Sequence, residues 1–283
     1  MKSTIVITGA SGFVGSAIIK ILLKSKHPVI AISRSKLTVP SGVKFIWTKD
    51  YINNISNCND TTCIHLAGTR DRVEASKLGP SHDIESINIT KTLLQKKFKR
   101  FIYTSTSAVY PTNMDRPCRP GDEINPSNNY ALTKLACEKH VLKAGGVVAR
   151  LSNIYGVGMA TSSVISEILS QIPGKGPLTV NRASVSRDFI WIDDVAKGLV
   201  AMAEGHQTGV FNLGSGKSQT VGEIAKMALE LAGESDRRVV STNSEIKDSN
   251  ITLDVKNTQK YFNWKAHVSM NWGLTELIQN KNR

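Results

Sequence analysis

The segment that decides the fold is Thr4-Ile-Val-Ile-Thr-Gly-Ala-Ser-Gly-Phe-Val-Gly15, near the start of this 283-residue chain. Its β-branched run predicts a buried strand, its GxxGxxG spacing predicts a tight turn, and the apolar period that follows predicts a helix beginning near Phe13. In such a βα unit, one glycine makes the turn and another lets backbone N–H groups approach a pyrophosphate, while Gly15 lets the helix lie close to the strand. The positive end of the helix dipole then faces the phosphates. The segment therefore predicts a dinucleotide-binding loop made of Gly9, Ser11, Gly12, Phe13, Val14 and Gly15.

The overall composition is that of a globular protein with a basic surface. Hydrophobic residues make up 40% of the chain, and no run approaches the roughly 20 apolar residues of a membrane span. No signal-peptide pattern precedes the first strand, so we expect a cytoplasmic protein. The formal net charge of +13 favours an anionic ligand. We interpret the densest basic run, residues 96–100, as a solvated helix end and expect no nucleic-acid partner.

Cysteine and histidine usage argues against structural cross-links. The four cysteines form no CxxC pair and the six histidines are scattered singly, so we predict neither a disulfide framework nor a metal site. His65 lies inside an apolar run, which favours a hydrogen-bonded core histidine over a catalytic one.

Strands and helices alternate through the first half of the chain. Apolar runs predict strands at residues 28–33, 43–47, 62–68 and 100–105, and a helical period covers 84–97. This alternation predicts an α/β protein with a doubly wound parallel sheet, in which ligands bind at the carboxyl ends of the strands. Further on, we predict helices at 160–172 and 221–231, with Thr220 as the N-cap of the second, and a surface loop at 235–250.

The ends of the predicted strands indicate a nicotinamide dinucleotide. In this kind of fold an acidic residue about 20 positions after the glycines holds the ribose of NAD, whereas a nearby arginine accommodates the extra phosphate of NADP. This chain has Ser33 and Arg34 there, which favours NADP over NAD. Further expected cofactor contacts follow the next two strands, at Asp50, Tyr51, Leu66, Ala67 and Gly68.

Hydroxyl groups and a Tyr-Lys pair predict proton-transfer chemistry. Thr106 and Ser107 follow the strand at 100–105, and Tyr130 lies four residues before Lys134, so one helix face carries both side chains. A phenol has a pKa of roughly 10, and a nearby ammonium lowers it by favouring the phenolate. The pair can therefore exchange a proton with a substrate hydroxyl or carbonyl, while Thr106 hydrogen-bonds the same oxygen and a nicotinamide transfers the hydride.

Several motifs together resemble the extended short-chain dehydrogenase/reductase family, in its nucleotide-sugar epimerase/dehydratase branch. These motifs, in order, occupy residues 9–15, 65–67, 105–110, 130–134, 150–156, 187–196 and 210–216. The resemblance implies a Rossmann domain formed mainly by residues 1–152, a small substrate-binding lobe formed mainly by 153–186 and 235–283, and a return of 187–234 partly to the first domain. It implies a nucleoside-diphosphate sugar as substrate, contacted by Ser107, Asn153 and Arg187, with Tyr130 and Lys134 also touching the cofactor. It further implies a homodimer formed through the helix that contains Asn88 and the helix that carries Tyr130.

Two departures from the family pattern narrow the expected reaction. Sugar 4,6-dehydratases of this family carry Asp-Glu directly after the active-site threonine, whereas this chain has Ser107-Ala108, so dehydration lacks its acid and base. The missing acid after the second strand suits an NADPH-dependent keto-sugar reductase, whereas a 4-epimerase would retain and recycle NAD. Both reactions remain open, as do a reductase of a non-sugar carbonyl and a non-catalytic binding protein with the same fold.

Overall fold

The computed structural model of the chain describes residues 2–35, 38–47, 58–68, 72–126, 128–243 and 249–281. Its largest element is a sheet of seven parallel strands in the order β3-β2-β1-β4-β5-β6-β10. The strands are β1 (Thr4–Thr8), β2 (Val29–Ser33), β3 (Val43–Trp47), β4 (Thr61–His65), β5 (Arg100–Thr106), β6 (Val147–Leu151) and β10 (Gly209–Leu213). This order confirms the predicted α/β class with a Rossmann-type, doubly wound parallel sheet.

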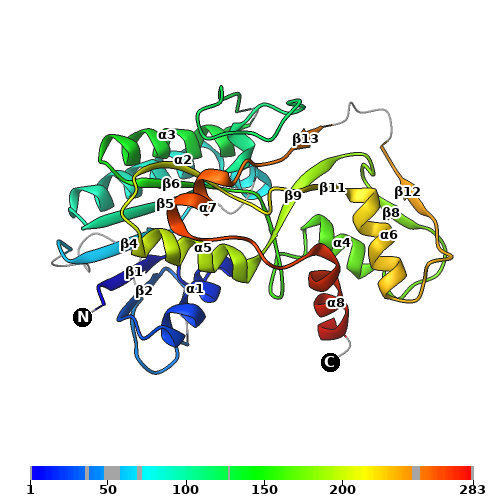
Figure 1. Cartoon of the computed structure of the whole chain (residues 1–283), viewed down its shortest axis with the longest axis horizontal. Coiled ribbons are helices and arrows are strands. Elements are labelled where there is room, and N and C mark those ends of the chain that lie inside the picture. Colours follow the sequence, from blue (N-terminus) through cyan, green and yellow to red (C-terminus); the bar gives the residue numbers. More distant parts are fainter. Residues whose placement is uncertain are drawn as a thin grey trace.

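Two pairs of helices cover the two faces of this sheet (Figure 1). Helices α1 (Phe13–Lys24) and α5 (Ile192–Glu204) pack together on one face, and α2 (Arg72–Gln95) packs with α3 (Asn129–Lys143) on the other. Because both faces are covered, the central strands β1, β2, β4, β5 and β6 bury almost every residue, whereas Lys44 on the edge strand β3 is exposed.

Helix α2 begins earlier than the sequence pattern predicts. It includes a kink at Gly79, which has a φ of 72°, and Pro80 follows that kink. Proline cannot continue the hydrogen bonding of a preceding turn. The regular apolar period, which predicted a helix over residues 84–97, therefore lies after the kink.

The order of the strands reverses beside β1. The chain runs outward from β1 through β2 to β3 and then returns to β4 on the other side of β1, where Thr8 pairs with His65. Ligands of open α/β sheets bind at such a switch point, outside the carboxyl ends of the strands. This topology brings the glycine loop, the end of β4 and the end of β5 to one edge of the sheet.

The remaining elements form a smaller lobe at one end of the molecule, except for α7 (Lys256–Phe262), which packs against β10 and α5 (Figure 1). In the lobe, β9 pairs with β7, β11 and β13, β8 pairs with β12, and α6 packs against α4 and α8. The bounds are β7 (Asn153–Tyr155), α4 (Val164–Ser170), β8 (Leu178–Val180), β9 (Ser186–Trp191), β11 (Ser218–Thr220), α6 (Val221–Leu231), β12 (Val239–Ser241), β13 (Asn250–Ile251) and α8 (Met270–Lys281). The division of the chain at the residue numbers given above remains a prediction.

Two sequence predictions in this lobe were wrong in part. The segment 235–250 is not all loop, because β12 pairs in parallel with β8 and Asn250 starts β13. Its strands are only two or three residues long, too short to show an alternating pattern. Helix α4 is shorter than 160–172, since Ser163 caps its start by accepting from the N–H of Ser166 and it ends shortly before Pro173.

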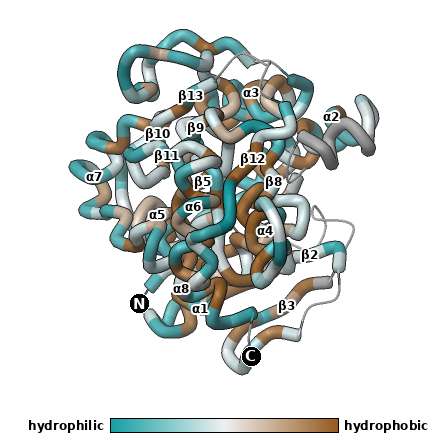
Figure 2. The backbone as a smooth tube through the Cα atoms, turned by 90° about the vertical axis from the view of Figure 1, so that its right-hand side faces the viewer, coloured by the Kyte–Doolittle hydropathy of each residue, from teal (hydrophilic) through white to brown (hydrophobic). Residues whose placement is uncertain are grey.

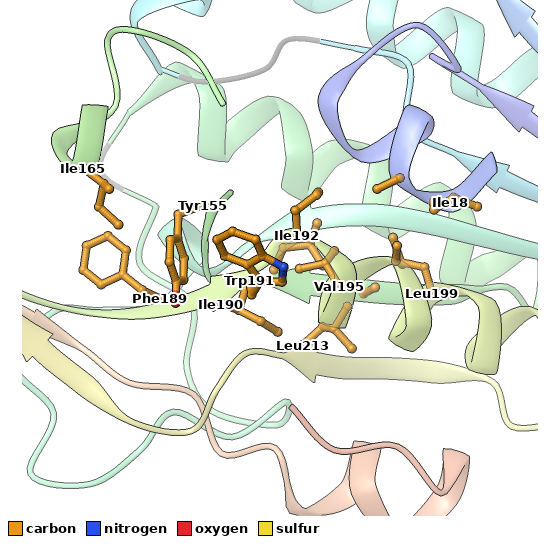
Figure 3. Packing of buried hydrophobic residues seen from close by; sticks show 14 of the residues in the cluster. Ile18, Tyr155, Ile165, Phe189, Ile190, Trp191, Ile192, Val195, Leu199 and Leu213 are labelled. Atoms are coloured by element: carbon orange, nitrogen blue, oxygen red, sulfur yellow. The ribbon is translucent and has the colours of Figure 1, made fainter. Parts of the chain in front are cut away.

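An aromatic cluster joins the core of the lobe to the core beside α5 (Figure 3). The ring of Tyr155 stands edge-on to Phe189, with 6.5 Å between ring centres, and edge-on to Trp191, with 5.3 Å between ring centres. Edge-to-face pairs of this kind add about 0.5–1.5 kcal/mol to the free energy gained by burial.

Along the backbone, hydrophilic residues gather in outer elements such as α7 (Figure 2).

None of the helices in the described ranges combines the length and the apolar character that crossing a bilayer requires. All four cysteines are free thiols in buried positions.

Candidate active site

The glycine loop is shaped by close backbone contacts that exclude side chains. Gly9 has a φ of +70°, and a Cβ there would lie 2.9 Å from the backbone nitrogen of Ala67. A Cβ on Gly15 would lie 2.6 Å from the carbonyl oxygen of Gly9, a separation that real Cβ atoms do not tolerate. These contacts pack the loop directly against the end of β4 and against the first turn of α1, where a side chain has no room.

The first turn of α1 is a candidate phosphate-binding site. Gly12 is the N-cap and provides no side-chain cap, so the N–H groups of the first turn remain for a ligand. Gly12 and Ser11 are exposed, while Phe13 and Val14 are half-buried. Helix N-termini of this kind are suited to phosphate groups because N–H dipoles and the helix macrodipole both favour negative charge.

The end of β2 carries the residues expected near the adenosine ribose. Ser33 is buried, its hydroxyl lies 2.5 Å from that of Ser11, and it accepts a hydrogen bond from the N–H of Ser35. The guanidinium of Arg34 lies 3.9 Å from Glu85 in an exposed position. Asp50 and Tyr51, which were also predicted to contact the cofactor, lie outside the described residues.

A buried histidine ties the end of β1 to helix α2. Thr90 donates its hydroxyl proton to the carbonyl of Ser86, so it accepts from the Nε2–H of His65, 3.1 Å away. The Nδ1 of His65 then accepts from the hydroxyl of Thr8 at 2.6 Å. Burial, and secondarily the nearby charge of Lys134, lower the pKa of His65 to about 3. His65 is thus a neutral, hydrogen-bonded core residue, as its apolar surroundings in the sequence predicted.

Tyr130 and Lys134 lie on α3, directly opposite the end of β4. Asn128 caps this helix by accepting from the N–H of Ala131. A small cavity next to the pair is lined by Ala67, Gly68, Ser86, Thr90, Tyr103, Tyr130, Thr133 and Lys134. The structure therefore brings both predicted acid/base residues together with two of the residues predicted to contact the cofactor.

Lys134 is a buried cation held in a fixed place. Its Nζ donates to the carbonyl of Thr104 at 3.0 Å and lies 5.1 Å from the centre of the Tyr103 ring and 5.8 Å from that of Tyr130. Burial lowers the pKa of Lys134, while the charges of Cys137 and Glu138 oppose that shift. The ammonium is therefore poised beside the phenol of Tyr130, in surroundings where an electrostatic interaction is stronger than in water.

Thr106 and Ser107 lie where β5 leaves the sheet. Thr106 is half-buried, its hydroxyl accepts from the N–H of Ala108, and Ser107 begins a short 3-10 helix, η1 (Ser107–Val109), that packs against α3. This turn places the two hydroxyl-bearing residues at the same edge of the sheet as Gly68 and the start of α3.

The residues predicted to contact a substrate lie on the lobe strands. Asn153 is exposed on β7 and pairs in register with Phe189 of β9. Arg187, also on β9, is half-buried, and its guanidinium donates to the carbonyl and the hydroxyl of Ser249, each at 2.7 Å. Both residues are therefore in the lobe that adjoins the sheet edge, on neighbouring strands.

Comparison with known proteins identifies the family. Residues 5–214 match the NAD dependent epimerase/dehydratase family. The chain belongs to this family. The matched span includes the glycine loop, Tyr130, Lys134 and Arg187, and it confirms the resemblance inferred from the motifs.

Individual members of the epimerase/dehydratase family match this chain over nearly its full length. It is 26% identical to a dTDP-4-dehydro-6-deoxyglucose reductase of Escherichia coli, covering 98% of this chain and 97% of that one. It is 25% identical to a putative UDP-glucose 4-epimerase of Methanocaldococcus jannaschii, covering 99% of both. The solved structure of MoeE5 in complex with UDP-glucuronic acid and NAD has the same fold, with a TM-score of 0.85, 24% identity and 99% coverage of both chains.

Several site features of this family member were missed by sequence reasoning. Tyr103, Ser86, Thr90 and Thr133 line the cavity beside Lys134, and Glu138 and Arg150 form a buried ion pair nearby. Residues 86, 90, 133 and 138 lie on helices without catalytic spacing. The position of Glu138 one turn after Lys134 was the one available signal.

Proposed function

We propose that this protein catalyses hydride transfer at a ring carbon of a nucleoside-diphosphate sugar, as a keto-sugar reductase or a 4-epimerase that uses NAD(P). The observation that carries the proposal is the buried ammonium of Lys134 beside Tyr130 and close to Gly68, whose neighbour Ala67 packs against Gly9 of the glycine loop. The curated relatives, which include a nucleotide-sugar reductase and a putative epimerase, support the same class of reaction.

The shape of the loop fits a dinucleotide. The first turn of α1 has no side-chain cap, so its N–H groups can bind a pyrophosphate, while Gly9 and Gly15 let the loop pack closely on the end of β4 and on the helix. When bound, the nicotinamide supplies or accepts the hydride. Ala67, Gly68 and Lys134 would border its ribose, since they line the cavity at the end of β4.

In the proposed mechanism, Tyr130 moves the proton. In the reducing direction its phenol gives a proton to the carbonyl oxygen of the sugar, and in the oxidising direction its phenolate takes one from the hydroxyl. Lys134 stabilises the phenolate with its charge. Thr106 donates to the same sugar oxygen and thereby orients the reacting carbon.

The end of β2 supports NADP over NAD. Arg34 is exposed at the position where the family's ribose-binding acid would lie, and Ser33 offers a hydroxyl rather than a carboxylate. A guanidinium pairs well with a phosphate through its planar fork of donors. This preference favours a reductase, which exchanges its cofactor in every turnover, over an epimerase, which recycles a bound one.

Arg187 and Asn153 are the residues that we propose bind the diphosphate of the substrate. Arg187 is a half-buried guanidinium on β9, next to the strand that carries Asn153.

Helices α2 and α3 form the proposed interface with a second copy of the chain. Ile84 on α2 and Leu132 on α3 are 60% and 50% exposed, so these two neighbouring helices offer apolar side chains to that copy.

The deciding experiment is to denature the purified protein and identify any dinucleotide in the supernatant by chromatography beside NAD and NADP standards. We expect the protein to be purified without a dinucleotide and to bind NADPH in preference to NADH. We also expect it to oxidise NADPH when it is given a nucleoside-diphosphate 4-keto-sugar. Stoichiometric NAD in the purified protein would favour the 4-epimerase activity over the reductase activity. Failure to bind either dinucleotide would overturn both.

A further inference from the structure

Three buried charged side chains lie together beneath the proposed acid/base pair. Lys134 is 8% exposed, Glu138 1% and Arg150 3%. Lys134 and Glu138 are one turn apart on α3, the spacing at which lysine and glutamate ordinarily pair on a helix. In this structure Lys134 instead donates to the backbone of Thr104.

The carboxylate of Glu138 is held by Arg150. The Nε of Arg150 donates to both carboxylate oxygens, at 3.1 and 3.3 Å, and its Nη2 donates to Oε2 at 2.7 Å. The hydroxyl of Ser105, on the neighbouring strand β5, donates to Oε1 as well. Four hydrogen bonds therefore draw the carboxylate toward β5 and β6.

Arg150 is itself fixed from two further sides. Its Nη1 donates to the carbonyl of Pro120 at 3.2 Å, and its guanidinium lies 4.8 Å from the centre of the Tyr110 ring. The hydroxyl of Tyr110 donates to Asn212 at 2.7 Å. A guanidinium with this many partners has one orientation, so the position of Glu138 is fixed too.

Stability alone does not account for such a pair. Desolvating two ions costs roughly as much as their attraction returns, so a buried ion pair is weak support for a fold. Within the described ranges, the titratable groups that face Lys134 are Tyr130, the neutral His65, Tyr103, Cys137 and Glu138, so Glu138 is the carboxylate able to neutralise it.

We infer that Arg150 is a positioning residue, which holds the Glu138 carboxylate away from Lys134 and so keeps the ammonium charge directed at Tyr130. The inference rests on the proposed role of Tyr130 as acid/base. Without Arg150, the carboxylate keeps the hydrogen bond from Ser105 but loses the other three, so it can pair with Lys134 at the ordinary helical spacing, and the phenolate loses its stabilising charge.

The test is a spectroscopic titration of Tyr130 that needs no substrate. The near-ultraviolet absorbance of tyrosinate is followed against pH for each variant and for the same variant with Tyr130→Phe, and the difference reports Tyr130. The other buried tyrosines do not interfere, because burial raises the pKa of Tyr103 and Tyr155 and raises that of Tyr110 to about 12.

We expect Arg150→Met to move the Tyr130 titration upward by about one pH unit, and Arg150→Met/Glu138→Gln to return it to the wild-type position. Glu138→Gln alone, which removes the carboxylate but keeps Arg150, should leave the midpoint at or below the wild-type value. Arg237→Met is the matched control, since Arg237 is a largely buried arginine that pairs with Glu234 in the lobe, and it should move nothing.

An unshifted titration in Arg150→Met, or a shift that the double variant does not reverse, overturns the inference. An upward shift in Glu138→Gln would also overturn it, since a disturbed structure and not the carboxylate would then be responsible. A wild-type Tyr130 that titrates at the ordinary value of a phenol would instead remove the proposed mechanism itself, and the inference with it.

Discussion

The ammonium of Lys134 lies 5.8 Å from the centre of the Tyr130 ring, one turn further along the same helix. Because Lys134 is buried and bound to the backbone of β5, this distance is set by the packing of α3 on the sheet. The proposed proton transfer depends on it.

Replacing Tyr130 by Phe should lower turnover at least about 100-fold, because the variant has no group to exchange a proton with the sugar oxygen. Dinucleotide binding should stay within about twofold of the wild type, since the ring and its packing remain. Steady-state kinetics and fluorescence titration with NADPH measure the two quantities. A fully active variant would rule out the mechanism.

Replacing Arg34 by Ser should weaken NADPH binding about tenfold through loss of a charge-assisted contact to the 2′-phosphate. NADH binding should not change, because NADH has no phosphate there. Isothermal titration calorimetry with both cofactors provides the measurement. Arg116→Ser, which removes an exposed arginine paired with Asp122, serves as control and should alter neither affinity.

Replacing Gly15 by Ala should lower the free energy of unfolding by about 1–3 kcal/mol and abolish dinucleotide binding, because the new methyl group would overlap the backbone of Gly9 and Ala10. Gly121→Ala is its control, since a Cβ there has no atom within 4 Å. Urea denaturation of both variants measures the effect. Equal stability of the two would contradict the close contact.

The stability of the protein should depend on pH through His65. Its folded-state pKa of about 3 lies below the unfolded value of 6.5, so between these values the unfolded chain binds a proton that the native protein does not. Stability is therefore fully present above about pH 6.5 and falls as the pH is lowered, by about 2 kcal/mol from pH 7 to pH 5.

Comparing His65→Gln with the wild type isolates this effect. Urea unfolding at pH 7 and at pH 5 should show a pH dependence that is smaller by that amount in the variant, whatever its absolute stability. The same pH dependence in both proteins would mean that His65 is protonated in the native state.

The predicted dimer is tested on α2 and α3. The double variant Ile84→Glu/Leu132→Glu should sediment as a monomer, since charges in an apolar interface are costly to desolvate. Val157→Glu, at a hydrophobic residue that is 55% exposed elsewhere on the surface, should leave the dimer intact. A wild-type protein that sediments as a monomer would contradict the proposal.

Local sequence patterns were enough to predict the features that depend on residues close together in the chain. Three predictions follow from such short-range geometry: the strand, glycine turn and helix that begin at Thr4, the N-cap Thr220, and the Tyr130–Lys134 spacing. The structure has each of them. Such features are set by backbone dihedral angles and helical periodicity, which a sequence displays directly.

Other features exist only because distant segments meet. Thr8, His65 and Thr90 become one hydrogen-bonded chain because β1, β4 and α2 are adjacent, and β12 exists because β8 offers it an edge. Glu138 shows the difference most clearly: its spacing from Lys134 favours a pair between them, but the fold places Arg150 of β6 closer. The sequence by itself determined the fold class and the spacing of Tyr130 and Lys134 on one helix. Only the tertiary structure decided which buried charges neutralise one another, since that depends on distances across the sheet that no local pattern encodes.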